Sequence, residues 1–302
     1  MQYFAPPYYR KFKCIADRCT HSCCIGWEID IDADELSAYR AMSGEAGELV
    51  RAAIVSDAQG AHFALQANGR CALLDERGLC RLITAAGETA LCEICREHPR
   101  FYNDVGCRWE CGLGVACEEA ARLMLDEEDY DVIEPLDACD ETECAATVSD
   151  FDAIAQRTAL YEVLRDGEIA YEDRLREITV RFGVSSGGVD MQALCAELEY
   201  LYAEHRSLFE GFGETHPLSA QEAVACERFF AYLIYRHAST AESAYDFRLS
   251  VGVALVLERI LRVLLCAHRL PPIEAVRILS EEIEYCEENV ALIRAYLERD
   301  LT

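Results

Sequence analysis

Positive charge is scarce in this chain of 302 residues. Lysine and arginine together number 28 against 55 aspartates and glutamates, which gives a net charge of −27. Lys11 and Lys13 are the only lysines. Proteins that bind nucleic acids or anionic membranes use clustered basic side chains to neutralise phosphates. The composition therefore argues against nucleic acid and against membrane surfaces as partners.

Long hydrophobic runs are also missing. The most apolar stretch, 251–266, contains Glu258, Arg259 and Arg262, so we expect a buried helix there and not a membrane span. Residues 1–7 have neither the basic start nor the apolar segment of a secretory leader. We therefore expect a cytoplasmic protein, in which thiols stay reduced or bind metal.

Cysteine, by contrast, is abundant. The chain has 17, an odd number that leaves one thiol over from a complete set of disulfides. Four cysteines fall within residues 14–24, and seven more follow by position 117: Cys71, Cys80, Cys92, Cys95, Cys107, Cys111 and Cys117. Because this set lies in loops beside glycine and charged residues, we expect it to bind a metal. We expect Cys195, Cys226, Cys266 and Cys286, on apolar helix faces, to be buried as small hydrophobic residues.

Two metal groups compete for the N-terminal thiols. Zinc takes four tetrahedral ligands, commonly from two short Cys-x2–4-Cys pairs, and the possible pairs are Cys92 with Cys95, Cys107 with Cys111, and Cys19 with Cys23. The adjacent Cys23 and Cys24 fit this pattern poorly because neighbouring side chains diverge. An iron–sulfur cluster accepts irregularly spaced ligands from several loops, so we favour it over zinc and over free thiols. The residues that we expect to bind the metal are Cys14, Cys19, Cys23, Cys24, Cys71, Cys80, Cys95 and Cys117.

The periodicity of apolar residues predicts an α+β protein that is mostly α. We expect a cysteine-rich domain over 1–125, an acidic connector over 126–149 and an all-α domain over 150–302. The first domain is predicted to contain a strand at 27–31, a helix at 32–42 capped by Asp32 or Asp34, and a helix at 45–56. Within 59–92 we expect short strands at 63–65, 71–74 and 79–83, and a turn at 75–78 makes the last two a hairpin with Cys71 and Cys80 at its base. A glycine-bearing loop at 107–117 and a helix at 117–125 follow. The helices predicted in the second are 150–165, 170–182, 190–210, 219–238, 244–268 and 273–299.

Residues 3–125 resemble the flagellin lysine-N-methylase family. The motifs that carry the resemblance are Tyr8-Tyr9 before Cys14, Cys19-x3-Cys23-Cys24 followed by Gly26-Trp27, Cys71-x-Leu73-Leu74, Gly78-Leu79-Cys80, Cys95-Arg96-x-x-Pro99-Arg100 and Cys117-Glu118-x-Ala120-Ala121-Arg122. Cys107 and Cys111 depart from the pattern. The resemblance implies methyl transfer from S-adenosylmethionine to lysine side chains of flagellin, with an iron–sulfur cluster, 4Fe–4S, held by the cysteines. The glycine fingerprint of many methyltransferases is absent.

Two arginines follow Cys95 closely. We expect Arg96 and Arg100 to neutralise a thiolate-rich cluster or to bind the carboxylate of a cofactor. The alternative for both is an ion pair with Glu93 or Glu97.

The sequence does not assign the catalytic base. Lysine attacks as the neutral amine, so a side chain must take up its proton. Glu28, Asp30, Tyr9 and Tyr102 are all candidates, and a solvent-exposed acidic strand is the alternative for Glu28 and Asp30. The alternative function is a non-catalytic zinc or iron–sulfur module for electron transfer or protein interaction.

Overall fold

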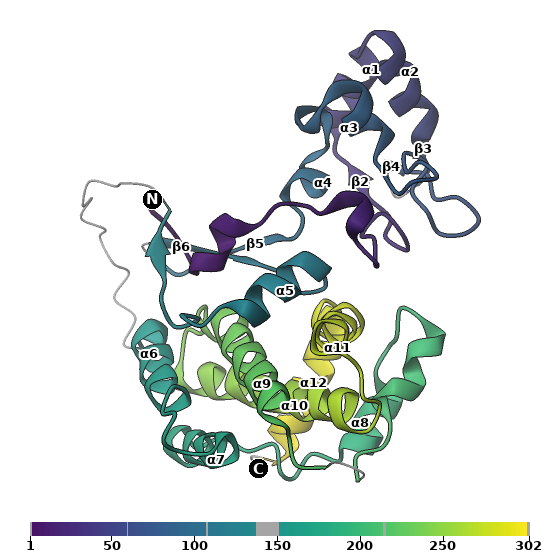
Figure 1. Cartoon of the computed structure of the whole chain (residues 1–302). Coiled ribbons are helices and arrows are strands. Elements are labelled where there is room, and N and C mark those ends of the chain that lie inside the picture. The colour runs from purple at the N-terminus through teal and green to yellow at the C-terminus, as the bar shows by residue number, and fades with distance from the viewer. Residues whose placement is uncertain (1, 59, 107, 137–150, 214–215, 301–302) are drawn as a thin grey trace. The chain divides into compact units, whose positions relative to one another are not determined.

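The computed structural model describes residues 2–58, 60–106, 108–136, 151–213 and 216–300. The described chain is α+β and mostly helical, as predicted (Figure 1). It divides into two compact units. The cysteine-rich unit is Lys13–Arg100, and the helical unit is Met1–Phe12 together with Phe101–Thr302.

This division differs from the predicted one because the first strand pairs far along the chain. Strand β1 (Gln2–Ala5) lies parallel to β6 (Arg108–Leu113) and antiparallel to β7 (Glu134–Pro135), in a sheet with the order β5-β6-β1-β7. Strand β5 is Arg100–Asp104. The N-terminal residues and the chain after position 101 therefore belong with the helices. The loop predicted over 107–117 was wrong for 108–113, which form β6, and is confirmed for 114–117.

The cysteine-rich unit has a small core of short elements. Its sheet has the order β2 (Asp30–Ile31), β4 (Ala61–Phe63) and β3 (Ile54–Ser56). Its helices are α1 (Ala33–Ala41), α2 (Gly44–Ala53), α3 (Arg81–Ala86) and α4 (Glu93–Glu97). The predicted cap of α1 is confirmed, because the Asp32 carboxylate accepts the Glu35 N–H at 2.7 Å.

Two of the strands predicted within 59–92 were wrong. The described part of that stretch after β4 has only single bridges, and Arg81 begins a helix. The bridges pair Ile25 with Arg70, Leu65 with Cys71, and Leu74 with Cys80. A short apolar run such as 79–83 is compatible with a strand or a helix, and its length does not separate the two.

The helical unit is built around the long helix α10 (Ala244–Cys266), against which α9, α11 and α12 pack. Its other helices are α5 (Glu118–Asp126), α6 (Ala153–Leu164), α7 (Tyr171–Phe182), α8 (Met191–Glu197), α9 (Ala220–Leu233), α11 (Pro272–Leu279) and α12 (Glu287–Asp300). The predicted helices at 190–210 and 273–299 are each broken. A 3-10 helix (Ala203–Phe209) follows α8, and a π-helical turn (Ser280–Glu284) separates α11 from α12.

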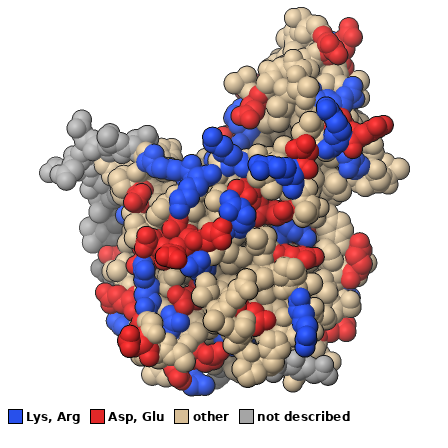
Figure 2. Space-filling view, viewed as in Figure 1, with Lys and Arg blue, Asp and Glu red and all other residues tan. Residues whose placement is uncertain are grey.

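The surface of the helical unit mixes charges of both signs. On the face shown in Figure 2, acidic side chains alternate with arginines over the helices. Among the described helices, none has both the length and the hydrophobicity that crossing a membrane requires.

Candidate metal centre

Backbone hydrogen bonds join the first cysteine loop to the chain around Cys71. The Cys71 N–H donates to the Cys24 carbonyl oxygen at 2.8 Å, and the Gly26 N–H donates to the Gly69 carbonyl oxygen at 2.9 Å. Gly26 and Gly69 have φ values of 82° and 75°, a left-handed backbone that favours glycine. These two glycines therefore let the loops meet closely enough to bring Cys24 and Cys71 together.

A tight turn places Cys80 beside the same chain segment. The Asp75 carboxylate accepts the N–H groups of Arg77 and Leu79, both at 2.9 Å, and closes the turn. The Arg81 N–H then donates to the Leu73 carbonyl oxygen at 2.8 Å. Cys80 lies directly before this anchor point, at the base of the hairpin as predicted.

The start of α4 contributes Cys92 and Cys95. Cys92 is the N-cap residue and is only 1% exposed, and the Cys95 thiol donates a hydrogen bond to the Cys92 sulfur. The Tyr39 hydroxyl holds the preceding loop by donating to the Ala90 carbonyl oxygen at 3.0 Å.

Five thiols of the cysteine-rich unit share one electrostatic environment, and we call them the thiol cluster: Cys24, Cys71, Cys80, Cys92 and Cys95. Burial raises the pKa of Cys71 and Cys80, and charge on Cys24 and Cys92 raises both further. The hydrogen bond to Cys92 raises the pKa of Cys95, while the same bond lowers the pKa of Cys92. One proton is thus shared between Cys92 and Cys95.

Within the thiol cluster, the Cys24 thiol is more acidic than an ordinary cysteine thiol. A hydrogen bond from the Cys23 thiol, supported by Ser22 and the positive charge of Arg70, lowers the pKa of Cys24 to about 7 against the effect of burial. A thiolate, not a thiol, is the metal ligand and the nucleophile. Cys24 is therefore prepared for either role near neutral pH.

The described thiols are not arranged in threes around the position of a single ion. Within the described residues, no three cysteine sulfur atoms lie within 4.8 Å of one another. A tetrahedral zinc with Zn–S bonds of about 2.3 Å places its sulfur ligands about 3.8 Å apart.

The remaining predicted ligands are placed differently. Cys14 is exposed, and in the described chain its thiol makes no hydrogen bond, whereas the Cys19 thiol donates to the His21 carbonyl oxygen at 2.7 Å. Cys117 precedes α5 in the helical unit. Cys107 lies outside the described residues, so its pairing with Cys111 has no structural account. The metal-binding roles of all these residues remain predictions.

Arg96 and Arg100 have protein partners. The Arg96 Nε atom lies 3.5 Å from a Glu97 carboxylate oxygen, which is the ion pair expected as the alternative. Arg100 donates to the Arg96 carbonyl oxygen at 3.3 Å. Cofactor binding by these two arginines also remains a prediction.

One candidate base has a partner that the sequence did not indicate. A Glu28 carboxylate oxygen lies 3.0 Å from His62 Nε2, and His62 is largely buried on β4 while Glu28 is exposed. The neighbouring Asp30 is exposed on β2. His62 sits within an ordinary alternating strand pattern, so only the pairing of β4 with β2 shows its relation to Glu28.

A buried acidic turn in the helical unit was also missed. The π-helical turn Ser280–Glu284 buries three carboxylates, and that of Glu284 is fully enclosed. Arg236 Nε and His237 Nε2, from the π-helical turn Ile234–Ala238, each lie 3.0 Å from Glu284 Oε1. These partners lower the pKa of Glu284 to about 2 despite its burial. Such turns occur often at functional sites.

The described residues contain one group of three potential ligands close enough for a single ion, in the helical unit. It consists of His216, Glu222 and Cys266. Glu222 already accepts the Ser219 N–H at 2.7 Å in the capping box of α9. Cys266 is buried, as predicted, and so are Cys195 and Cys226, whereas the prediction was wrong for Cys286, which is half-buried. Helix capping and core packing account for this group.

The structure thus defines a protein of two units with a thiol cluster in one of them. Comparison with known proteins finds similar proteins in Salmonella. Over 130 residues, 41% of this chain, it is 28% identical to a Lysine-N-methylase of Salmonella choleraesuis and 27% identical to one of Salmonella typhimurium. It is also 27% identical over 130 residues to the Flagellar biosynthetic protein FliU of Salmonella muenchen. These matches confirm the resemblance predicted from the motifs.

The extent of the matches is limited. They cover 32% of the length of the two lysine-N-methylases and 77% of FliU. No family model matches the chain, and no solved structure matches it.

Proposed function

We propose that this protein transfers methyl groups from S-adenosylmethionine to lysine side chains of a protein substrate, flagellin, in the cytoplasm. The observation that carries the proposal is the thiol cluster, because four of its five cysteines belong to the motifs that carry the resemblance to the lysine-N-methylase family. The names of the relatives, Lysine-N-methylase and Flagellar biosynthetic protein, support lysine methylation and a flagellar substrate.

We propose further that the thiol cluster holds an iron–sulfur cluster, 4Fe–4S. Ligands of an iron–sulfur cluster commonly come from several loops, and the five thiols come from separate chain segments around Cys24, Cys71, Cys80 and Cys92. The mutual effect of the thiols on one another's pKa values also suits an iron–sulfur cluster, because metal binding displaces protons from thiols. When bound, such a group would supply Lewis-acidic iron, held by the thiolates of the cluster.

The chain's own residues then have defined tasks. Arg70 balances the negative charge of the Cys24 thiolate. Glu28, oriented by His62, takes the proton from the attacking lysine ammonium, so that the amine becomes nucleophilic. The exposed position of Glu28 lets a side chain on another protein reach it.

Two measurements test the proposal. Protein purified without oxygen is expected to contain about four iron and four sulfide per chain. Flagellin incubated with this protein and labelled S-adenosylmethionine is expected to gain mass on lysines, and flagellin with acetylated lysines is the matched control. Zinc in place of iron would contradict the proposed iron–sulfur cluster. Flagellin that gains no label on its lysines would contradict the proposed methyl transfer.

The burial of the thiol cluster favours the alternative of a non-catalytic metal module. Cys71 and Cys92 are 8% and 1% exposed and belong to the hydrophobic core of the cysteine-rich unit. Structural metal sites are closed in this way. A protein that contains the metal but neither binds S-adenosylmethionine nor methylates flagellin would have this function.

A further inference from the structure

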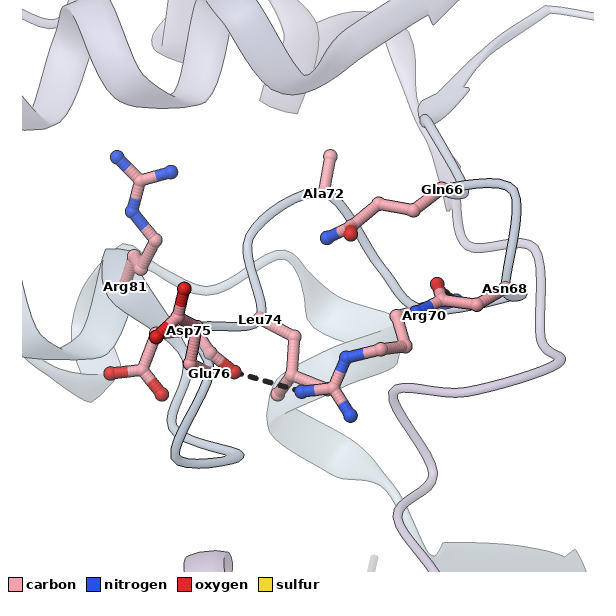
Figure 3. Close-up of a pocket in the computed structure, with 8 residues that line it drawn as sticks. All are labelled: Gln66, Asn68, Arg70, Ala72, Leu74, Asp75, Glu76 and Arg81. Atoms are coloured by element: carbon pink, nitrogen blue, oxygen red, sulfur yellow. Dashed lines mark hydrogen bonds between the residues drawn. The ribbon is translucent and has the colours of Figure 1, made fainter.

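A hollow with a volume of about 420 Å³ opens in the cysteine-rich unit (Figure 3). Pockets for small molecules have volumes of about 300–1,000 Å³. Arg70, which directly precedes Cys71, and Arg81, which directly follows Cys80, both line it. Two of the chain segments that carry the thiol cluster therefore also form part of the wall of the hollow.

The hollow presents charges of both signs that protein groups do not use. Arg81 and Glu76 are exposed, and in the described part of the chain neither side chain makes a hydrogen bond or an ion pair. Arg70 is held in place by donating to the Asp75 carbonyl oxygen at 2.8 Å. The Asp75 carboxylate is occupied by Arg77 and Leu79. A ligand thus meets a free guanidinium, a free carboxylate and a second, fixed guanidinium.

The arrangement of these groups suits a ligand with two charged ends. In Figure 3, Arg81 and Arg70 stand on opposite sides, with Asp75 and Glu76 between them. Leu74 and Ala72 contribute the apolar part of the lining. Guanidinium groups bind carboxylates with paired, charge-assisted hydrogen bonds. The matching ligand is an α-amino carboxylate with an aliphatic side chain.

We propose that this hollow binds the methionine end of S-adenosylmethionine. Arg81 pairs with the ligand's carboxylate, Glu76 pairs with its ammonium group, and Leu74 contacts its methylene carbons. The identity of the ligand rests on the proposed function, whereas the amino-carboxylate chemistry rests on the hollow itself. Arg96 and Arg100, which the sequence indicated for this role, are engaged with neighbouring protein groups.

Calorimetric titration of the full-length, anaerobically purified protein tests the assignment. The probes are S-adenosylhomocysteine and its decarboxylated analogue, and the variants are Arg81→Gln and Glu76→Gln. Arg40→Gln is the matched control, because Arg40 is an exposed arginine of α1 that does not line the hollow. Neither Arg81 nor Glu76 has a side-chain partner, so both variants are expected to fold.

The expected result is a specific coupling between arginine and carboxylate. Arg81→Gln weakens S-adenosylhomocysteine binding about tenfold, the equivalent of a lost charge-assisted contact, and leaves binding of the decarboxylated analogue nearly unchanged. Glu76→Gln weakens the binding of both probes, since both retain the ammonium group. Arg40→Gln binds both like the wild type.

Other outcomes overturn separate parts. Equal effects of Arg81→Gln on the two probes, or none, would show that Arg81 does not bind the carboxylate, and methyl transfer would remain as proposed. If wild-type protein failed to bind S-adenosylhomocysteine, the cofactor of the proposed function would be wrong. L-methionine is then the second probe for the hollow. Binding of L-methionine that depends on Arg81 would support an amino-carboxylate site in the hollow, and no binding would contradict such a site.

Discussion

The N–H group of Cys71 donates a hydrogen bond to the carbonyl oxygen of Cys24, 2.8 Å away. This bond joins two cysteine-bearing segments that lie 47 positions apart in the chain. It is made by the backbone, so the positions of the two thiols do not depend on a metal. The thiol cluster is therefore expected to persist in protein without metal.

Removing thiols from the cluster is expected to release metal. Serine in place of Cys71 or Cys80 keeps the size of the side chain but replaces a thiolate ligand, so each variant should lose most of its metal. Cys286→Ser is the matched control, because Cys286 belongs to the helical unit and lies outside the set of expected metal ligands. Metal analysis of anaerobically purified variants measures the effect. Full metal content in Cys71→Ser and Cys80→Ser would show that the ligands lie elsewhere.

The acidity of Cys24 predicts how fast it is alkylated in metal-free protein. The pKa of Cys24 is lowered to about 7. The thiol is therefore almost fully ionised at pH 8, and the thiolate form is lost as the pH falls below 7. Iodoacetamide labelling of Cys24, followed by peptide mass spectrometry, should be half-maximal near pH 7. Cys23→Ala removes the donated hydrogen bond and should move the midpoint upward, while Cys23→Ser, which keeps a donor, should move it less. The same midpoint in the wild type and in both Cys23 variants would contradict the role of the Cys23 hydrogen bond.

The sequence predicted the local features of this protein well. The cap at Asp32, the helix after Cys117 and the turn before Cys80 depend on neighbouring residues, and all three are present. Cys92 was recognised as one half of a Cys-x2-Cys pair but left out of the expected ligand set. The structure places it beside Cys95, within the thiol cluster.

The features that the sequence did not predict depend on contacts between distant residues. Parallel pairing of β1 with β6 joins positions more than 100 apart and moves the N-terminal residues into the helical unit. The partner of Glu28, His62, is likewise set by strand pairing. From the sequence alone, a glutamate such as Glu284 is expected at the surface. Its burial is stabilised by a cation, Arg236, that is distant along the chain, and the sequence does not show this pairing.

Neutralising Glu284 is expected to destabilise the helical unit. Glu284→Gln removes the charge that compensates the largely buried Arg236, and breaking a buried ion pair typically costs about 3–5 kcal/mol. Glu172→Gln is the control, because Glu172 is 43% exposed in its ion pair with Arg262. Chemical denaturation followed by circular dichroism gives the free energy of unfolding. Equal stability of the two variants would contradict the role of Glu284.

The same residue predicts an acid dependence of stability. The pKa of Glu284 is lowered in the folded protein from its ordinary value of 4.5 to about 2, so the folded state binds its proton more weakly. Its contribution is complete above the unfolded pKa and is lost as the pH falls from about 5 toward 2. Between these pH values, the stability of Glu284→Gln should fall less steeply than that of the wild type. Parallel slopes would mean that other carboxylates carry the acid sensitivity.

The close packing of Gly114 against Tyr285 predicts a steric effect. A Cβ atom at position 114 would lie 1.5 Å from the Tyr285 hydroxyl oxygen and 3.0 Å from an Arg236 nitrogen. Tyr285 cannot easily yield, since the Arg236 guanidinium stacks 4.4 Å from the centre of its ring.

Gly114→Ala should therefore lower the free energy of unfolding by about 1–3 kcal/mol, as overpacking of a core usually does. Gly167→Ala, where no heavy atom lies within 4 Å of the new carbon, is the control and should change stability little. Adding Tyr285→Phe to Gly114→Ala removes the closest atom but leaves Cζ at 2.7 Å, so it should restore only part of the loss. Full stability of Gly114→Ala in denaturation experiments would show that β6 and the acidic turn are not packed in this way.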